Sequence, residues 1–406
     1  VQFQVSPAVG VGGGNIVPSN TLYKWDAPSY TGTVTGGQSS QNLFVSHVSG
    51  TLSNRTNTQQ TVTYSVTPQT GNCTGSVFSV VVTLDPKPEF VTLSTVICSG
   101  VEFQVSPVVG TYSGNIVPAN TTYTWGEPGY TASLSGGISG TNQSFIRSTI
   151  INASNTTQTA TYTVIPTTGN CTGSSFTLIV TVHPVPSIAS LSTVTCSGTP
   201  FEVSPTNVNP DIVPVNTRYR WSEPTYTGNL NGGVSATDQA TINGLLYNTS
   251  SVEQRAFYVV TPSTVNCDVS NSFTVTVRVR AGGYIDPMST VVCSGVQFNV
   301  VPQDGVNGIV PDGITYSWNV PNYTLSVSGG QSDTGQLSIF GTLTNNTNVI
   351  QTATYLVTPT PLNCGPNSNF TLTVTILPAA YINPITVPVC NGVVFGFTPA
   401  DGSPYG

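Results

Sequence analysis

The chain has 406 residues, of which only 6% are charged, and its 16 acidic and 9 basic residues give a net charge of −7. The basic residues are too few and too scattered to follow a phosphate backbone, so nucleic acid is not an expected partner. Hydrophobic residues still make up 38% of the chain and lie in short regular runs, which excludes a disordered chain. No apolar run approaches the roughly 18 residues of a membrane helix, so we expect no direct membrane insertion.

The two ends of the sequence read as pieces of a repeat. Residues 1–7 match residues 101–107, and the latter directly follow the phrase Cys98-Ser99-Gly100. From Phe395 onward, the sequence begins the same strand in a further copy. We therefore expect both ends to cut through repeats, and any targeting or anchoring element to lie outside this sequence.

The repeat is most visible at its tryptophans, which follow one another after 100, 96 and 97 residues and each stand in a Tyr-x-Trp-x-x-Pro phrase. The period of two predicts a strand with Tyr and Trp on one face, ended by the proline. We interpret the Trp as filling the space between two sheets, and the alternative is an exposed aromatic platform for glycans. The predicted core aromatics are Trp25, Trp125, Trp221 and Trp318.

After the Trp strand, each copy continues through the same series of elements. A Gly-Gly turn is followed by a Tyr-x-Val-x-Pro strand, a turn that holds a Cys, and a last strand rich in Val, Thr and Ile. No amphipathic helical stretch interrupts this series. The glycine pairs lie at residues 36–37, 136–137, 232–233 and 329–330, and the last strands at 78–84, 176–182, 273–279 and 370–376.

These elements predict an all-β chain of tandem immunoglobulin-like sandwiches, at about 100 residues for each sandwich. Proline-rich junctions such as Asp85-Pro86-Lys87-Pro88 favour stiff linkers and hence an elongated rod. The predicted boundaries are 1–86 for a truncated first repeat, 87–184, 185–281 and 282–378 for complete repeats, and 379–406 for the start of a fifth.

The eight cysteines fall into two classes, one in the turn before the last strand and one in a Cys-Ser/Asn-Gly phrase that opens the next copy. Neither class has the spacing of a zinc site, so we predict disulfides in an oxidising compartment rather than metal ligands or free thiols. The favoured pairing lies within repeats and leaves partners outside the sequence for Cys73 and Cys390. It joins Cys98 with Cys171, Cys196 with Cys267, and Cys293 with Cys364.

Two other pairings stay open. Pairing between neighbours in the sequence, beginning with Cys73 and Cys98, leaves no cysteine alone, but the strand on each side of the linker should hold these residues far apart. The other pairing runs from the opening phrase of one repeat to the turn before the last strand of the next repeat. Such a staple would cross-link the rod.

The sequence offers no candidate for catalysis and no cofactor site. Its two histidines, His47 and His183, do not recur between repeats. We expect His47 to be a solvated surface residue and His183 to be a solvated residue in a linker. No nucleophile elbow, phosphate-binding loop or paired carboxylates are present, and the isolated Asp residues do not predict a calcium site. Asn-x-Ser/Thr sequons are expected by chance in so Asn-rich and Thr-rich a chain, and we predict no glycans at Asn54, Asn120, Asn152, Asn155 or Asn248.

The phrases Val-Ile-Cys-Ser-Gly, Tyr-x-Trp, Tyr-x-Val-x-Pro and Gly-Asn-Cys-Thr-Gly-Ser resemble the PKD-like, immunoglobulin-like repeats of giant surface adhesins in Bacteroidota. The resemblance covers essentially the whole chain and implies a cell-surface filament for gliding motility or attachment. It further implies type IX secretion and contact with outer-membrane motility machinery through other regions. Weak multivalent binding to polysaccharide or other extracellular surfaces is the expected partner interaction. The alternatives are a spacer array or a carbohydrate-binding array of a large secreted polysaccharide-degrading enzyme.

Overall fold

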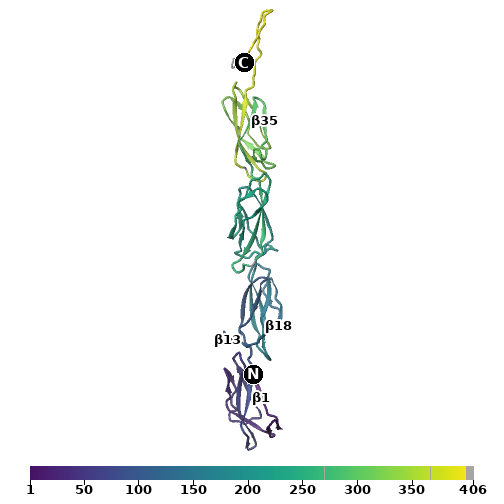
Figure 1. The fold of residues 1–406 in the computed structure, drawn as a ribbon, viewed down its shortest axis with the longest axis vertical. Helices are drawn as coiled ribbons and strands as arrows, with labels where there is room; N and C mark the ends of the chain where they lie inside the picture. Colours follow the sequence, from purple (N-terminus) through teal and green to yellow (C-terminus); the bar gives the residue numbers. More distant parts are fainter. Residues whose placement is uncertain (269, 366, 399–406) are drawn as a thin grey trace. The chain divides into compact units, whose positions relative to one another are not determined.

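The computed structural model describes residues 1–268, 270–365 and 367–398, which form strands, turns and loops (Figure 1). No helix in these residues is long and apolar enough to cross a membrane. By their contacts they form two units, one of Val1–Pro186 with segments 207–215 and 264–268, and one of the remaining described residues. Each unit holds two apolar cores, so the predicted all-β class of tandem immunoglobulin-like sandwiches is confirmed. We number the repeats by these cores, which draw on residues 3–84, 90–182, 188–279 and 285–376.

Repeat 2 illustrates how the strands are arranged into two sheets. Its first sheet has the order β11 (Leu93–Cys98), β22 (Phe176–His183), β20 (Gln158–Thr168), β15 (Thr122–Trp125), β18 (Gly140–Gln143). Its second sheet has the order β12 (Glu102–Val105), β19 (Ile146–Asn152), β17 (Leu134–Gly136). Neighbouring strands are antiparallel except β11 and β22, which are parallel and place Cys98 opposite His183. The strand that opens the repeat therefore runs beside the strand that closes it.

The other repeats follow the same plan, with small differences at the edges. Repeat 1 has β10 (Phe78–Leu84), β8 (Gln60–Thr70), β4 (Leu22–Trp25) and, in the second sheet, β1 (Gln2–Val5), β7 (Val48–Asn54), β6 (Val34–Gly36). Repeat 3 has β23 (Leu191–Cys196), β32 (Phe273–Arg280), β31 (Gln254–Ser263), β25 (Arg218–Trp221), β28 (Ala236–Gln239), with the pairs β24 (Phe201–Val203)/β29 (Ile242–Gly244) and β27 (Leu230–Asn231)/β30 (Tyr247–Asn248). Repeat 4 has β34 (Met288–Cys293), β43 (Phe370–Leu377), β42 (Gln351–Thr360), β37 (Thr315–Trp318), β40 (Asp333–Gln336), and β35 (Gln297–Val300), β41 (Ile339–Asn345), β39 (Val327–Gly329).

Short strands complete the sheets and the loops. On the Tyr-x-Val strands lie β5 (Ser29–Tyr30), β16 (Gly129–Tyr130), β26 (Thr225–Tyr226), β38 (Asn322–Tyr323), β9 (Cys73–Thr74) and β21 (Cys171–Thr172). Separate pairs are β2 (Gly10–Gly12)/β3 (Asn15–Val17), β13 (Gly110–Tyr112)/β14 (Asn115–Val117) and β33 (Tyr284–Ile285)/β36 (Gly308–Ile309).

The tryptophans lie in the cores, where they are 4–6% exposed. Each indole N–H donates a hydrogen bond to a backbone carbonyl thirteen residues later, such as Trp125 Nε1 to Ile138 O at 2.9 Å. A buried indole needs this bond because its N–H would otherwise lose its water partner without replacement. Side chains held in this way cannot serve as a glycan platform.

The Gly-Gly turn is explained by crowding at one point in each repeat. In repeat 4, Gly329 and Gly330 have positive φ values of 86° and 75°, which glycine adopts without strain. A Cβ on Gly330 would stand 2.8 Å from the hydroxyl oxygen of Tyr355 and 3.0 Å from the ring of Pro321. Burial, with a smaller contribution from Tyr323, raises the pKa of the Tyr355 hydroxyl to about 12. The Trp-x-x-Pro phrase, the glycine pair and the Tyr-x-Val strand thus meet at one contact.

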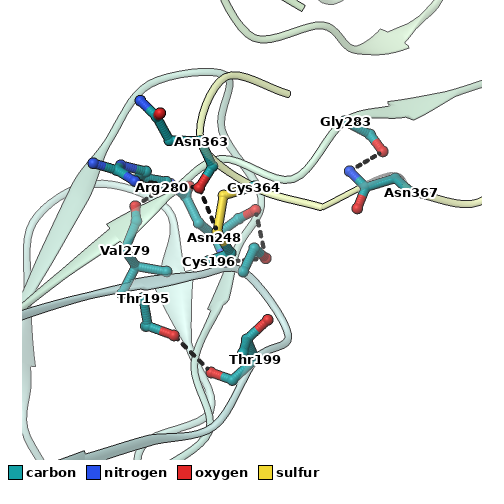
Figure 2. The surroundings of a disulfide bond; sticks show 11 residues. Thr195, Cys196, Thr199, Asn248, Val279, Arg280, Gly283, Asn363, Cys364 and Asn367 are labelled. Atoms are coloured by element: carbon teal, nitrogen blue, oxygen red, sulfur yellow. Dashed lines mark hydrogen bonds between the residues drawn. A yellow bond between two sulfur atoms is a disulfide. The ribbon is translucent and has the colours of Figure 1, made fainter. Parts of the chain in front are cut away.

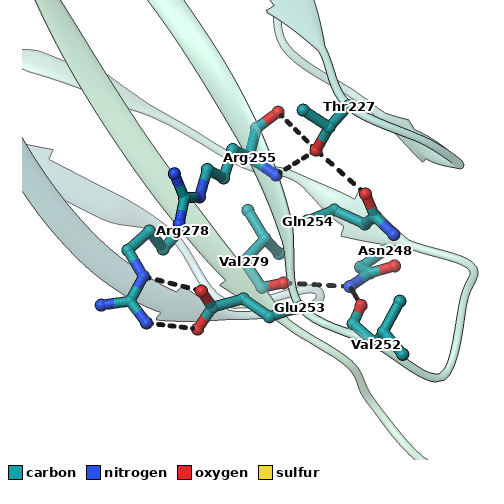
Figure 3. A network of polar contacts seen from close by, with 8 residues as sticks. All are labelled: Thr227, Asn248, Val252, Glu253, Gln254, Arg255, Arg278 and Val279. Carbon is teal, nitrogen blue, oxygen red and sulfur yellow. Dashed lines mark hydrogen bonds and ion pairs between the residues drawn. The ribbon is translucent and has the colours of Figure 1, made fainter.

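An asparagine, buried in repeats 2, 3 and 4 and half-buried in repeat 1, ties the second sheet of each repeat to its last strand. Asn152 donates from Nδ2 to the carbonyls of Thr156 at 2.8 Å and Val182 at 3.0 Å. Its Oδ1 accepts hydrogen bonds from the backbone N–H and hydroxyl of Ser154. Figure 3 shows the equivalent Asn248 bonded to Val252 and Val279. The equivalent residues are Asn54, Asn152, Asn248 and Asn345.

Attributing the sequons at Asn54, Asn152 and Asn248 to chance was therefore wrong. At these positions, and at Asn345, the Ser or Thr two residues later bonds to the amide oxygen, so Asn-x-Ser/Thr is a structural turn.

We expect the crowded glycine to tolerate alanine less well than an open glycine of similar φ. Gly335 has φ of 69° and open space where a Cβ would stand, so Gly335→Ala should cost only the left-handed strain of about 1–2 kcal/mol. Gly330→Ala should cost about 1–3 kcal/mol more, because Tyr355 or Pro321 must shift. Hydrogen exchange of the β42 backbone amides measures the loss of stability in both variants. Equal losses of protection in the two variants would contradict the packing explanation.

Removing the buried amide should loosen the attachment between the two sheets. Asn152→Ala leaves two carbonyls without their donor, one of them at a fully buried position, and should destabilise repeat 2 by about 2–3 kcal/mol. Asn155→Ala, three residues further along the same turn, is the matched control and should change stability by less than about 0.5 kcal/mol. Thermal unfolding, monitored by hydrogen exchange of the β22 backbone amides, distinguishes the two variants. A similar loss of stability in both variants would contradict the proposed role of Asn152.

Candidate functional site: disulfide junctions between repeats

The described residues contain no group of three or more His, Cys, Asp or Glu side chains able to hold a metal ion. His47 is half-buried beside the hydroxyl of Ser46. His183 is the last residue of β22 rather than a linker residue, because its carbonyl still accepts the N–H of Ser99. The chemistry that recurs along the chain is that of the cysteines.

Two disulfides join consecutive repeats. Cys98 of repeat 2 is bonded to Cys267 of repeat 3, and Cys196 of repeat 3 is bonded to Cys364 of repeat 4, each with Cα atoms 5.9 Å apart. Each bond links the end of an opening strand to the turn before the last strand of the next repeat. This is the staple arrangement, and the favoured pairing within repeats was wrong.

Strand direction explains why pairing within a repeat fails. Because β11 is parallel to β22, Cys98 lies beside the end of β22 at His183. Cys171 lies before the start of β22 and pairs with Thr168 of β20. The eight residues of β22 span about 25 Å at a rise of about 3.3 Å, whereas the Cα atoms of a disulfide lie within about 7 Å. The two cysteines of one repeat therefore lie near opposite ends of its sandwich.

Polar contacts surround the staple between repeats 3 and 4 (Figure 2). Arg280, at the end of β32, donates from Nη1 to the carbonyl of Asn363 at 3.2 Å. Asn367 donates from Nδ2 to the carbonyl of Gly283 at 2.8 Å. The Cys196 sulfur lies 3.6 Å from the same Asn363 carbonyl. The turn of repeat 4 is therefore held by hydrogen bonds on both sides of the disulfide.

A second contact joins the same two repeats. The carboxylate of Asp304 in repeat 4 accepts hydrogen bonds from Ser251 in repeat 3 and from the N–H of Val310, and these bonds lower the pKa of Asp304. Nearby, Arg278 and Glu253 form a two-bond ion pair at 2.7 and 3.1 Å (Figure 3). Both side chains of that pair are partly exposed, so it adds little stability. The disulfide is the strongest link at this junction.

Four cysteines of the described residues are not in disulfides. Three of them are exposed and one, Cys171, is half-buried. Each belongs to one of the two classes that form the staples. The four are Cys73, Cys171, Cys293 and Cys390.

The sequence identified the cysteines that form disulfides but not which cysteine is bonded to which. The signal that could have found it is the edge position of the opening strand, which an immunoglobulin-like sandwich can pair in parallel with its last strand. The polar partners Arg280, Asn363 and Asn367 were not identified, because they do not stand out in a sequence with so many Asn residues.

Comparison with known proteins agrees with the repeat structure. The family model of the PKD-like domain matches residues 15–88, 95–186, 192–282 and 290–380. No curated protein sequence matches the chain.

Solved structures are similar at low identity. A fragment of the titin I-band is 12% identical, with 72% of this chain and 97% of that chain covered and a TM-score of 0.32. The human desmocollin-1 ectodomain is 12% identical, with 96% and 80% covered and a TM-score of 0.26. A fucoidan hydrolase of glycoside hydrolase family 107 is 11% identical, with 72% and 44% covered and a TM-score of 0.20. Since four consecutive matches to one family model cover most of the residues, the chain belongs to the PKD-like domain family.

Proposed function

We propose that this chain is a load-bearing and adhesive section of a long extracellular bacterial surface protein, similar to the gliding-motility adhesin SprB. The observation that carries the proposal is the overlap of the two disulfides. Cys196 lies inside the loop closed by Cys98 and Cys267, and Cys267 lies inside the loop closed by Cys196 and Cys364. Overlapping loops limit how far the chain can be drawn out under force.

The size of this limit follows from the residue numbers. From Cys98 to Cys364 the polypeptide runs through 266 residues (364 − 98). Crossing both disulfides, from Cys98 to Cys267, back along the chain to Cys196 and on to Cys364, shortens the covalent route to 71 residues (267 − 196). At about 3.5 Å per extended residue, the greatest separation of Cys98 and Cys364 falls from about 930 Å to about 250 Å. Such a limit suits a protein that carries tension.

Strand geometry within a repeat suits the same task. The chain enters repeat 2 at Leu93 of β11 and leaves at His183 of β22, and these residues are at opposite ends of two parallel strands. Tension on the two chain ends therefore loads the hydrogen bonds between the strands together, in shear, instead of opening them one after another. The same pairing recurs between β23 and β32 and between β34 and β43.

The location and partners follow from chemistry and from the resemblance to surface adhesins. Disulfides persist in oxidising compartments, which supports an extracellular, cell-surface location. Export by type IX secretion and contact with motility machinery would involve other regions of the protein. Most outward positions on the strands are uncharged and many carry hydroxyls, as at Thr161 and Thr163 of β20. Each such face would bind polysaccharide or other hydrated surfaces weakly, and the combined binding of many faces would make adhesion strong.

Pulling single molecules by their ends tests the load-bearing role. We expect reduction to release about 680 Å of additional contour length, since the covalent route from Cys98 to Cys364 grows by 195 residues (266 − 71). The double variant Cys267→Ser/Cys364→Ser should show the same length without reductant. A Cys293→Ser variant, which alters an unpaired cysteine, should keep the short length. An oxidised chain that extends as far as the reduced chain would overturn the proposal.

Valency tests the adhesive role. Beads coated with many copies of the chain should adhere to a polysaccharide surface at least 100-fold more strongly than the single chain binds. Beads coated with an unrelated protein of similar net charge control for nonspecific adsorption. Tight binding by the single chain would instead indicate one discrete site, and absence of adhesion on any polysaccharide or hydrated mineral surface would remove the adhesive part of the proposal.

A further inference from the structure

The fold gathers most of the chain's positive charge on one face of repeat 3, which we call the arginine face. Five of the nine basic residues stand at outward positions of its first sheet, where they alternate with buried residues on β25, β31 and β32. Asp238 contacts Arg218 and Glu253 contacts Arg278, which leaves a net charge of +3 (5 − 2) among these groups. The five are Arg218, Arg220, Arg255, Arg278 and Arg280.

Two of these arginines stand directly opposite each other. Arg255 of β31 pairs with Arg278 of β32, and both residues are exposed (Figure 3). Like charges at directly opposite positions destabilise a sheet, whereas threonine pairs stabilise it. The other three repeats have threonine pairs here, so repeat 3 carries an unfavourable pair that the fold does not require. The threonine pairs are Thr61–Thr83, Thr159–Thr181 and Thr352–Thr375.

Neighbouring carboxylates do not neutralise the arginine face. Glu253 accepts two hydrogen bonds from Arg278, but Arg220 and Arg255 form no ion pair with any residue that the structure describes. Arg220 lies on β25 opposite Thr261 of β31. That position is six residues along β31 from Arg255 (261 − 255), or about 20 Å at about 3.3 Å per residue. Positive charge is therefore spread across the face.

An aromatic ring lies between the charged ends of this face. Phe257 of β31 is half-buried at an outward position, between the buried residues Ala256 and Tyr258. It stands opposite Thr276 of β32. A phenyl ring beside a hydroxyl suits a sugar ring, which has apolar C–H faces and hydroxyl edges. The other repeats have a smaller and polar residue at the position of Phe257, namely Thr63, Thr161 and Thr354.

We propose that the arginine face binds an anionic polysaccharide, whose sulfate or carboxylate groups meet the guanidinium groups and whose sugar ring covers Phe257. Guanidinium groups form paired hydrogen bonds with such oxyanions, and a bound anion offsets the repulsion between Arg255 and Arg278. Nucleic acid fits less well, because this face offers few cations for closely spaced phosphates.

This inference rests on the proposed adhesive role and assigns one class of polysaccharide to one face of the chain. A few exposed arginines bind weakly, so strong adhesion still depends on many copies. Repeat 4 contains no basic residue, and repeats 1 and 2 have threonine at the positions of Arg255 and Arg278. Repeat 3 is therefore the specialised member of the array.

The test measures binding of the whole chain in solution to three polymers with one backbone, which are dextran, dextran sulfate and carboxymethyl dextran. We expect the native chain to bind at least one charged polymer about tenfold or more tightly than dextran. Raising NaCl from about 0.05 M to about 1 M should remove this preference, because salt screens exposed charges. Equal binding of all three polymers at low salt would contradict the proposal.

A triple variant tests the arginines without disturbing the fold. Arg220→Thr/Arg255→Thr/Arg278→Thr introduces the residues that repeat 2 has at these positions, and should remove the preference for charged dextran. Hydrogen exchange of the β31 backbone amides should show equal or greater stability in this variant, because a threonine pair replaces an arginine pair. Lost binding together with retained stability identifies a binding role. Unchanged binding would overturn the proposal.

A charge-matched control separates the arginine face from net charge. Arg55→Thr/Lys87→Thr/Arg147→Thr removes three charges from exposed positions outside repeat 3 and should keep the preference for charged dextran. Equal weakening in both triple variants would indicate attraction to net charge alone and overturn the proposal. A single-stranded DNA oligonucleotide that binds more tightly than both charged dextrans would overturn the assignment to a polysaccharide.

Failure of this site is distinguishable from failure of the adhesive role. Bead adhesion to a polysaccharide surface, together with equal binding of dextran sulfate by the native chain and the arginine variant, would contradict the site and leave the adhesive role in place. Absence of bead adhesion on every surface, dextran sulfate included, would contradict both.

Discussion

Parallel pairing of the opening strand with the last strand is the constraint on which the other features depend. It places both ends of the repeat on one sheet and carries the opening cysteine to the end where the chain leaves, as at Cys98 and His183. The next repeat begins there, and its turn before the last strand is the cysteine-bearing loop within reach. Disulfide bonding between consecutive repeats therefore follows from strand direction and requires no special feature of the linker.

Each sandwich supplies a rigid base for this junction. The buried Trp, the tyrosine against the glycine pair, and the asparagine bonded across the sheets recur in all four cores. The asparagine matters most for the junction, because Asn152 binds the carbonyl of Val182, the residue before His183. Asn248 does the same at Val279, one residue before Arg280, which in turn contacts the stapled turn of repeat 4. Core packing and junction geometry are thus connected through single hydrogen bonds.

Much of the fold could be predicted from the sequence because its signals are local and repeated four times. The Tyr-x-Trp phrase, the glycine pairs and the alternating last strands each correspond to the element expected of them. The disulfide pairing could not, since it depends on whether Cys98 approaches Cys171 or the next repeat, and that depends on the direction of an edge strand. The role of Asn152 was also missed, because a common residue in a common tripeptide gives no local sign of burial.

Mapping the disulfides of the native protein under non-reducing conditions tests the central claim most directly. Digestion between the cysteines followed by mass spectrometry identifies each linked pair of peptides. The account predicts links of Cys98 to Cys267 and of Cys196 to Cys364. Links of Cys98 to Cys171 and of Cys196 to Cys267 would contradict it, because they would require an opening strand that does not run beside the last strand of its own repeat.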